Sequence, residues 1–369
     1  MKARKLQVKL LNREASQVLR LVILITTLFI TACSDQTADK VTQNEHQPRA
    51  SSSVSECQDI EHELGTTEVC GQPQKIVALG PSMLETILAL EIQPVGYADY
   101  FALPHQKFDQ PVQQIAYLGN RVTGQPSNVG SSGEPSLETI AKLKPDLILG
   151  DYIKNQDEYA LLSKIAPTLL FAYHETDQER QRNFEIIAKA LGRSEQAKKV
   201  IEAHKQRLAN FSEEFKPIAT TYPQVLLMIA DDLNQNLRLE SSNSACGNLI
   251  EDLGFQLVSL PSLEQSAKQS NSISIEALPQ LDADLIIIEA WNSDFSELVE
   301  NPVERQLKKV KQQWNSNAIA QSMQASKEGR VYFTSPYLCH ALLGPIGTEI
   351  FLNQLRQQLL SEDAKNGES

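Results

Sequence analysis

The sequence lacks the short motifs that accompany common enzyme chemistries. It contains no Gly-x-Ser-x-Gly elbow, no His-Glu-x-x-His zinc motif, no Cys-x-x-Cys pair and no phosphate-binding loop. Its six histidines are scattered along 369 residues, and their spacing does not group metal ligands. We therefore expect no enzyme, no bare metal site and no resident cofactor. An exported α/β enzyme is the disfavoured alternative.

The chain also lacks an excess of positive charge. It has 34 Lys and Arg against 46 Asp and Glu, a net charge of −12, and no basic stripe interleaved with aromatic residues. This balance argues against nucleic acid as a partner. A hydrophobic content of 41% and a charged content of 22% are typical of a globular protein, and the length suffices for two domains.

No apolar run near the N-terminus is long enough to cross a bilayer as a helix. Residues 21–30 form a short run after a segment rich in Lys and Arg, as in a signal peptide. The run ends in Ile30-Thr31-Ala32-Cys33, which resembles a lipobox. We predict a signal peptide over residues 1–32 and a lipid on Cys33 that anchors the chain to the outer side of a membrane, in the periplasm or cell envelope. An ordinary signal peptide with a chance cysteine is the alternative.

Residues 33–55 hold almost no large apolar side chain, so they are predicted to be a flexible tether. Four further cysteines follow in a chain whose export permits disulfides. Cys57 and Cys70 flank two short strand patterns around a glycine turn, and we predict that they pair. Cys246 and Cys339 either pair with each other or remain free thiols.

Strand and helix patterns alternate through the rest of the chain. Strands are predicted at 75–80, 94–97, 146–150, 168–172, 224–230, 256–260, 284–288 and 329–334. Helices are predicted at 83–90, 137–143, 157–166, 247–255, near 303–325 and at 345–360. Ser82 and Glu85 resemble a capping box before the first helix. Residues 177–216 are predicted as a helical connector, broken once at Gly192. The alternation favours βαβ units and parallel sheets.

One helix–strand unit occurs twice. Residues 136–152, SLETIAKLKPDLILGDY, align without a gap on residues 274–290, SIEALPQLDADLIIIEA. The alignment places Asp146 on Asp284 at the start of each predicted strand. In both copies the apolar face of the helix should cover the strand that follows it, so each half of the chain holds one copy.

With both halves laid out, the chain resembles the substrate-binding proteins of bacterial ABC importers for ferric siderophores and cobalamin. The blocks that carry the resemblance are residues 62–96, 135–150, 162–171, 273–288, 329–333 and 342–355. The family implies an α/β fold with two Rossmann-like lobes, here 56–176 and 217–369, joined by a long helix. It also implies a ferric siderophore in the cleft between the lobes, an ABC permease with its ATPase as partner, and a monomer. A cobalamin or haem receptor is the alternative ligand class.

Aromatic and cationic side chains near the ends of strands are the candidate ligand contacts. Tyr152 follows the first repeated strand, Trp291 follows the second, and Tyr337 follows the strand at 329–334. Arg121 and Arg238, both predicted in loops, are the candidate cations. Many relatives that bind hydroxamates have an arginine after a glycine where this chain reads Gly130-Ser131-Ser132, which leaves the siderophore class open.

The resemblance further suggests one docking glutamate on each lobe for the permease, at Glu158 and Glu251. A sensor subunit that uses the same fold without transport is a third alternative, and it would not need these contacts.

Overall fold

The structure is a computed structural model that describes residues 56–172, 176–235, 237–258, 272–281, 283–291 and 301–366, without the side chains of Cys339 and residues 360–366. The predicted signal peptide, Cys33 and most of the tether lie outside these residues. Val54–Ser369 forms one compact unit. Within the described residues, no helix has the length and apolar character needed to cross a membrane.

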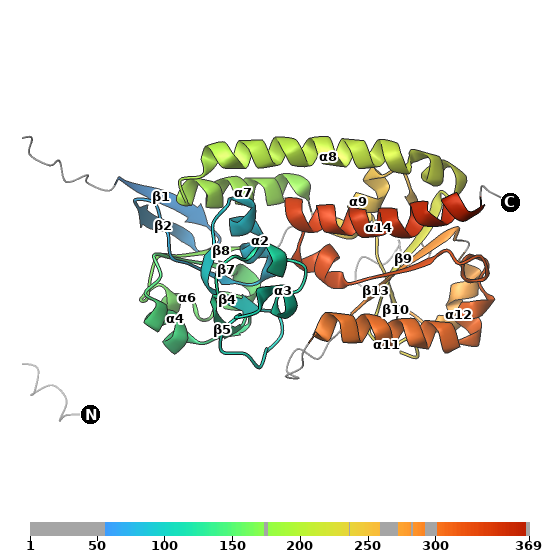
Figure 1. Cartoon of the computed structure of the whole chain (residues 1–369), viewed down its shortest axis with the longest axis horizontal. Coiled ribbons are helices and arrows are strands. Elements are labelled where there is room, and N and C mark those ends of the chain that lie inside the picture. Colours follow the sequence, from blue (N-terminus) through green and yellow to red (C-terminus); the bar gives the residue numbers. More distant parts are fainter. Residues whose placement is uncertain are drawn as a thin grey trace, which may run out of the picture. The chain divides into compact units, whose positions relative to one another are not determined.

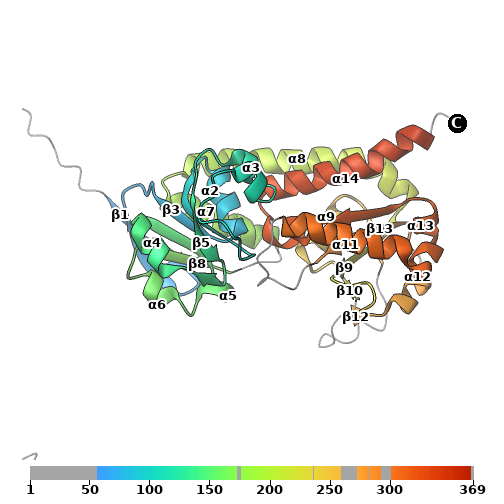
Figure 2. The same ribbon diagram turned by 60° about the horizontal axis from the view of Figure 1, so that its bottom comes forward.

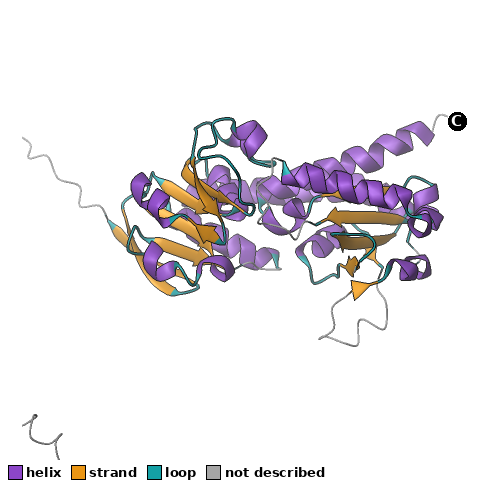
Figure 3. Ribbon diagram, turned by 90° about the horizontal axis from the view of Figure 1, so that it is seen from below, coloured by secondary structure: helices purple, strands orange, loops and turns teal. Residues whose placement is uncertain are grey.

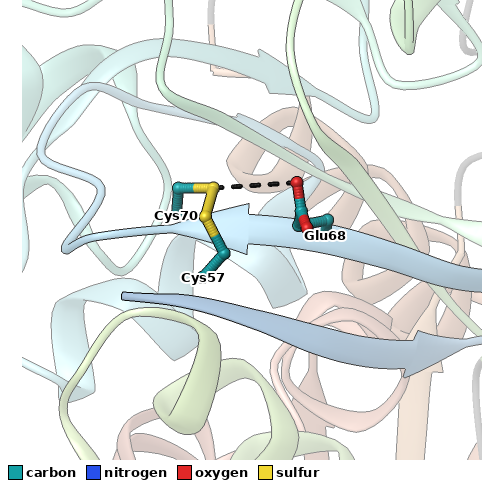
Figure 4. Close-up of a disulfide and its surroundings, with 3 residues drawn as sticks. All are labelled: Cys57, Glu68 and Cys70. Carbon is teal, nitrogen blue, oxygen red and sulfur yellow. Dashed lines mark hydrogen bonds between the residues drawn. A yellow bond between two sulfur atoms is a disulfide. The ribbon is translucent and has the colours of Figure 1, made fainter. Parts of the chain in front are cut away.

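The first element is a hairpin of β1 (Cys57–His62) and β2 (Gly65–Cys70). The two strands are antiparallel with Cys57 opposite Cys70, and these cysteines form the predicted disulfide (Figure 4). Glu68 Oε1 lies 3.9 Å from the Cys70 sulfur. A disulfide sulfur has no proton to donate, so this contact is not a hydrogen bond, and the cluster does not offer thiolates to a metal.

The N-terminal lobe is built on a six-stranded sheet with the order β6-β5-β4-β3-β7-β8. Neighbouring strands are parallel except β5 and β6. The strands are β3 (Ile76–Leu79), β4 (Pro94–Asp99), β5 (Ser127–Ser131), β6 (Glu134–Pro135), β7 (Leu147–Asp151) and β8 (Thr168–Phe171). Four of them were predicted. β5 and β6 were missed because Ser127–Ser131 lacks the apolar run by which the other strands were recognised.

Short helices cover both faces of this sheet. They are α2 (Pro81–Ala89), α3 (Pro111–Gln114), η1 (Gly119–Arg121), α4 (Leu137–Leu143), α5 (Tyr152–Asn155) and α6 (Tyr159–Leu162). Successive residues of β3 point to opposite faces: Ile76 and Ala78 belong to one apolar cluster and Val77 and Leu79 to another. The sheet is therefore buried on both sides, as parallel sheets usually are.

Two helices form the connector. α7 (Asp177–Ala190) ends before Gly192, whose φ of +66° suits a glycine, and α8 (Ser194–Thr221) then runs for 28 residues (Figure 1). The helix continues past the predicted end of the connector at residue 216 and passes through Pro217. Phe215 and Ile218 are buried on either side of the proline, so packing outweighs the lost backbone hydrogen bond.

The C-terminal lobe has a second six-stranded sheet, in which the path β12-β10-β9-β13-β14 is joined by β11 alongside β9. β10 is antiparallel to both of its neighbours, and the other pairs are parallel. The strands are β9 (Gln224–Ala230), β10 (Leu237–Leu239), β11 (Gln256–Leu257), β12 (Ser272–Ile273), β13 (Leu285–Ala290) and β14 (Val331–Thr334). Arg238 therefore lies in a strand rather than in the predicted loop.

Helices flank this sheet too, as Figures 2 and 3 show. They are α9 (Ala245–Asp252), η2 (Ile275–Gln280), α11 (Pro302–Ser316), α12 (Ala318–Ser322), α13 (Gln324–Lys327), η3 (Tyr337–Ala341) and α14 (Pro345–Asn366). The single helix predicted near 303–325 is thus three helices, broken at Asn317, whose side chain caps α12, and at Met323. Residues of β9 alternate between two clusters: Val225 and Leu227 share one with the N-terminal lobe, and Leu226 and Met228 face α11 and α12.

Glu85 links the two lobes through hydrogen bonds. The predicted capping box does not form: α2 begins at Pro81, and its N-cap Gly80 makes no side-chain bond. Instead, the buried Glu85 carboxylate accepts hydrogen bonds from the backbone N–H groups of Gly344, Ile346 and Gly347 at the start of α14. It supplies the cap that α14 lacks locally. Burial raises the pKa of Glu85 to about 7, although the three backbone hydrogen bonds oppose the shift.

Candidate functional site

The carboxyl ends of the parallel strands carry polar and aromatic residues in both lobes. β4 ends at Asp99 and is followed by Tyr100, β13 is followed by Trp291, and β14 leads into η3 with Tyr337. In open α/β sheets, ligands bind beyond this edge. A ligand site is therefore expected at these residues.

A hydrogen bond between lobes stands at the centre of this region. The Tyr337 hydroxyl donates to Asp99 Oδ1, and the Tyr97 hydroxyl donates to Asp99 Oδ2 at 2.7 Å. All three side chains are buried. Burial raises the pKa of Asp99, while the hydrogen bonds from Tyr337 and Tyr97 counter that effect. The contact ties η3 of the C-terminal lobe to the end of β4.

Aromatic rings surround Tyr337. Its ring lies 5.7 Å from that of Tyr100, 6.1 Å from that of Phe101 and 6.3 Å from that of Tyr117, measured between centroids. The three neighbours belong to the N-terminal lobe. Aromatic pairs at these separations attract one another beyond simple burial. Apolar and hydrogen-bonded contacts between the two lobes therefore lie in the same region.

Each lobe also presents a cation above an aromatic face. Lys154 Nζ lies 4.5 Å from the centroid of the Tyr100 ring, and the Arg238 guanidinium carbon lies 5.8 Å from the Trp291 ring. Tyr100 and Trp291 line one small cavity of about 30 Å³ between the lobes. Such pairs place a positive charge beside an aromatic face in each lobe.

A larger cavity of about 580 Å³ adjoins this one and shares Phe101, Val303 and Tyr337 with it. One wall is the N-terminal segment around residues 101–117, and the other is the start of α11. This volume is typical of a site for a small molecule. We refer to the two cavities together as the cleft.

An acidic pair and a histidine lie beside Trp291. One oxygen each of Glu240 and Glu289 and a ring nitrogen of His340 lie within 4.8 Å of one another. His340 Nε2 is 2.9 Å from Glu289 Oε2, and the His340 ring stands edge-on to Trp291 at 5.9 Å. Burial disfavours the charged imidazole, but the nearby Glu289 carboxylate outweighs it and raises the pKa of His340. Burial and the Glu289 charge also raise the pKa of Glu240.

The structure brings three of the five predicted ligand residues to this region. Trp291 and Tyr337 line the small cavity, and the Arg238 guanidinium lies over the Trp291 ring. Tyr152 begins α5 and is not among the residues that line the cleft. Arg121 lies on η1 with its guanidinium 4.0 Å from Glu349 of α14, and Arg207 of α8 approaches the same carboxylate. Arg121 thus lies beside α14 and the connector helix α8.

The predicted docking glutamates occupy different surroundings. Glu158 precedes α6 and is half-buried, and its Oε2 has no hydrogen-bond partner among the described residues. Glu251 lies on α9 and accepts a hydrogen bond of 2.9 Å from Ser242. α9 packs against α8 through a bond from Ser212 to the Asp252 carbonyl, whereas α6 lies away from α8 in both views (Figures 1 and 2).

Sequence reasoning missed several residues of the region. Tyr100 could have been found, because it follows β4 as Trp291 follows β13. Glu240, Glu289 and His340 could not, because His340 and Glu289 are 51 positions apart and meet only in the folded sheet. Cys246 is buried and disulfide-bonded, and its partner is not among the side chains that the structure describes.

Comparisons with known proteins agree with this architecture. The Fe(3+)-citrate-binding protein YfmC of Bacillus subtilis is 30% identical over 319 residues, which cover 84% of this chain and 86% of that protein. The "Probable siderophore-binding lipoprotein YfiY" of the same organism is 26% identical over 316 residues, which cover 84% of this chain and 88% of that one.

Among solved structures, Staphylococcus aureus SirA complexed with staphyloferrin B superimposes with a TM-score of 0.63. The match covers 82% of this chain and 98% of SirA at 23% identity, so it shows a shared fold. The expected α/β fold with two lobes is confirmed. Residues 76–338, well over half of the chain, match the family described as "Periplasmic binding protein". The chain belongs to the periplasmic binding protein family.

Proposed function

We propose that this protein captures a ferric siderophore in the cleft and delivers it to an ABC permease for iron uptake. Relatives of this chain bind ferric citrate and siderophores, and this family consists of substrate-binding proteins rather than enzymes. The observation that carries the proposal is the pair of cation–aromatic contacts, Lys154 with Tyr100 and Arg238 with Trp291, one on each lobe.

The chemistry of these pairs favours an anionic chelate rich in carboxylate oxygens. Arginine and lysine bind carboxylates through charge-assisted hydrogen bonds, and an aromatic face packs against the carbon skeleton of the ligand. In a chelate the organic ligand already coordinates the iron, so the protein needs to recognise only the outer surface. Ferric citrate, the ligand named for YfmC, is the first candidate.

The architecture supports capture with little movement. One apolar cluster includes Ile76 and Ala78 of the N-terminal sheet together with Val225 and Ile287 of the C-terminal sheet. α8 connects the two lobes as one continuous helix. A shared core and a stiff connector favour a small closure upon binding.

Tryptophan fluorescence tests ligand capture directly, because the chain has two tryptophans. Trp291 lies at the cleft and Trp314 is buried beneath α12, so Trp314→Phe should keep the response to ligand and Trp291→Phe should remove it. The protein is titrated with ferric citrate, a ferric hydroxamate, a ferric catecholate, cobalamin and haem. No saturable response to any ferric complex would overturn the proposal, and saturation by cobalamin or haem alone would reassign the ligand class.

Anchoring and docking form the second part of the proposal. The lipobox at Cys33 and the lipoprotein named among the relatives support a lipid anchor on the outer side of a membrane. Cys33→Ser should move the protein from the membrane fraction to the soluble fraction.

Glu158→Ala combined with Glu251→Ala should abolish iron uptake and leave chelate affinity unchanged. Uptake equal to that of the wild type would favour a sensor without a transport role.

A further inference from the structure

We propose that Glu240, Glu289 and His340 form a binding site for a divalent transition-metal ion in the C-terminal lobe, in addition to the ferric chelate. The three residues come from three separate elements: Glu240 follows β10, Glu289 lies in β13 and His340 lies in η3. One donor atom from each lies within 4.8 Å of the other two. A small movement of the side chains would bring all three to a single ion.

The donor set indicates the class of metal. Two carboxylate oxygens and one imidazole nitrogen suit Mn²⁺, Fe²⁺, Co²⁺ or Zn²⁺. Ca²⁺ and Mg²⁺ prefer sites made of oxygen alone, so the histidine disfavours them. The three protein ligands also leave coordination positions for water.

A second observation points to a missing ligand. The Glu289 side chain is 0% exposed and lies in β13, which is paired on both sides, with β9 and β14. Its Oε2 contacts His340, but its Oε1 has no hydrogen-bond partner among the described residues. A buried carboxylate oxygen without a partner is unfavourable because it has lost water and gained nothing in return. A bound cation would satisfy it.

The charges around the cluster allow for an ion. Glu240 and Glu289 supply two negative charges, which a divalent cation bound to neutral His340 would balance. Arg238, held over Trp291 next to the cluster, would then remain available to an anionic chelate. The competing interpretation is a purely structural pair of Glu289 and His340, with no affinity for metal.

Metal titration of the full chain separates these interpretations. Protein stripped with a chelator is titrated with Co²⁺, monitored by its visible absorption, and with Zn²⁺ and Mn²⁺ by calorimetry, with no iron complex present. We expect one ion per chain at the cluster and a change in Trp291 emission. His340→Gln and Glu240→Gln should each weaken binding at least ~10-fold.

A matched control uses another partly buried histidine. His204 lies on α8, so His204→Gln should bind metal as the wild type does. Metal should also raise the unfolding temperature of the wild type and of His204→Gln, but not that of His340→Gln. Glu289→Gln keeps the shape of the side chain, and if it does not fold, Glu240→Gln provides the same test at a half-buried position.

Three outcomes would overturn the proposal. They are no binding of Co²⁺, Zn²⁺ or Mn²⁺ by the wild type, equal binding by the wild type and His340→Gln, and an equal loss in His204→Gln. Each histidine variant keeps every histidine except the one that it replaces, so any weak binding by the others cancels in the comparison with the wild type. Because no chelate is used, failure here leaves the proposed iron function standing, and failure of that function leaves this site standing.

Discussion

The two copies of the repeated unit begin in the same way. Asp146 Oδ2 accepts the backbone N–H groups of Gln74 and Lys75 before β3, and Asp284 Oδ2 accepts that of Gln224 at the start of β9. In each lobe the aspartate thus joins the start of its own strand to the start of the neighbouring central strand. The repeated aspartate therefore sets the register of two sheets by the same contact.

The helices of the two copies differ. Residues Leu137–Leu143 form an α-helix whose N-cap Ser136 accepts the N–H of Thr139, whereas Ile275–Gln280 form a 3₁₀ helix. The second copy has Pro279 where the first has Ala141. Proline has no N–H to donate to the preceding turn, which disfavours a regular α-helix there. In both copies the predicted apolar residues still pack over the strand.

The strand ends differ most. Asp151 and Glu289 occupy equivalent positions in the repeat, yet Asp151 caps α5 by accepting the N–H of Lys154, and Glu289 faces His340. Asp151 caps the helix that directly follows it, whereas Glu289 contacts η3, 51 positions further along the chain. The aspartates at the strand starts therefore make the same contact in both lobes, whereas the acids at the strand ends make different ones.

The largest expected effect concerns Glu85. Ser136 caps α4, the helix that directly follows it, whereas Glu85 caps α14 of the other lobe. Its pKa is about 7 in the folded protein against 4.5 for an ordinary glutamate, so the folded state binds more protons between these pH values. The stabilising effect is full below pH 4.5 and is lost as pH rises through about 7. Relative to Glu85→Gln, the free energy of unfolding of the wild type should fall by about 3 kcal/mol over this window.

Urea unfolding at several pH values measures this difference. Glu202→Gln, which alters an exposed glutamate on α8, is the control, and the pH dependence of its unfolding free energy should follow that of the wild type. A constant difference between the wild type and Glu85→Gln from pH 4.5 to 8 would show that Glu85 does not titrate in this range.

The second effect sharpens the comparison of the aromatic residues beyond the repeats. Trp291 lines the cleft with Arg238 above it, whereas Tyr152 is not among the lining residues. Trp291→Ala should weaken binding of the preferred ferric chelate about 30-fold, or ~2 kcal/mol, as loss of a tryptophan at the centre of a site does. Tyr152→Ala should have little effect. Calorimetry with ferric citrate compares the two, and equal losses would return Tyr152 to the site.

The third effect tests the shared role of the two aspartates. Asp146→Ala and Asp284→Ala each remove the acceptor of backbone N–H groups at a strand start, and each should lower the free energy of unfolding by about 1 kcal/mol. Asp157→Ala, at an exposed position of the same lobe as Asp146, is the control. A loss in one lobe only would mean that the repeated contact stabilises the two sheets unequally.

The smallest effect comes from the proline that separates the two helices. Pro279→Ala makes the second copy resemble the first, and the free energy of unfolding should change by no more than about 1 kcal/mol. A crystal structure of the variant would show whether residues 275–280 become α-helical. If they remain a 3₁₀ helix, tertiary packing rather than Pro279 sets their geometry.

Local patterns were sufficient for much of the fold. Apolar runs such as 224–230 predicted strands because both faces of a parallel sheet are buried, and the two cysteines of a hairpin predicted their own disulfide. Prediction was weaker where packing opposed propensity. α8 continues through Pro217 because the residues around it are buried. The Glu85 side chain caps α14 instead of its own helix, α2.

The sequence by itself determined the two α/β halves, the repeated aspartates and Trp291 at a strand end, because these follow from periodicity within a short stretch of chain. Only the tertiary structure decided that Tyr100 rather than Tyr152 lines the cleft with Trp291, that Arg121 lies beside α14, and that Glu240, Glu289 and His340 meet. Contacts between distant positions depend on how sheets and helices pack, and a local pattern carries no information about that packing.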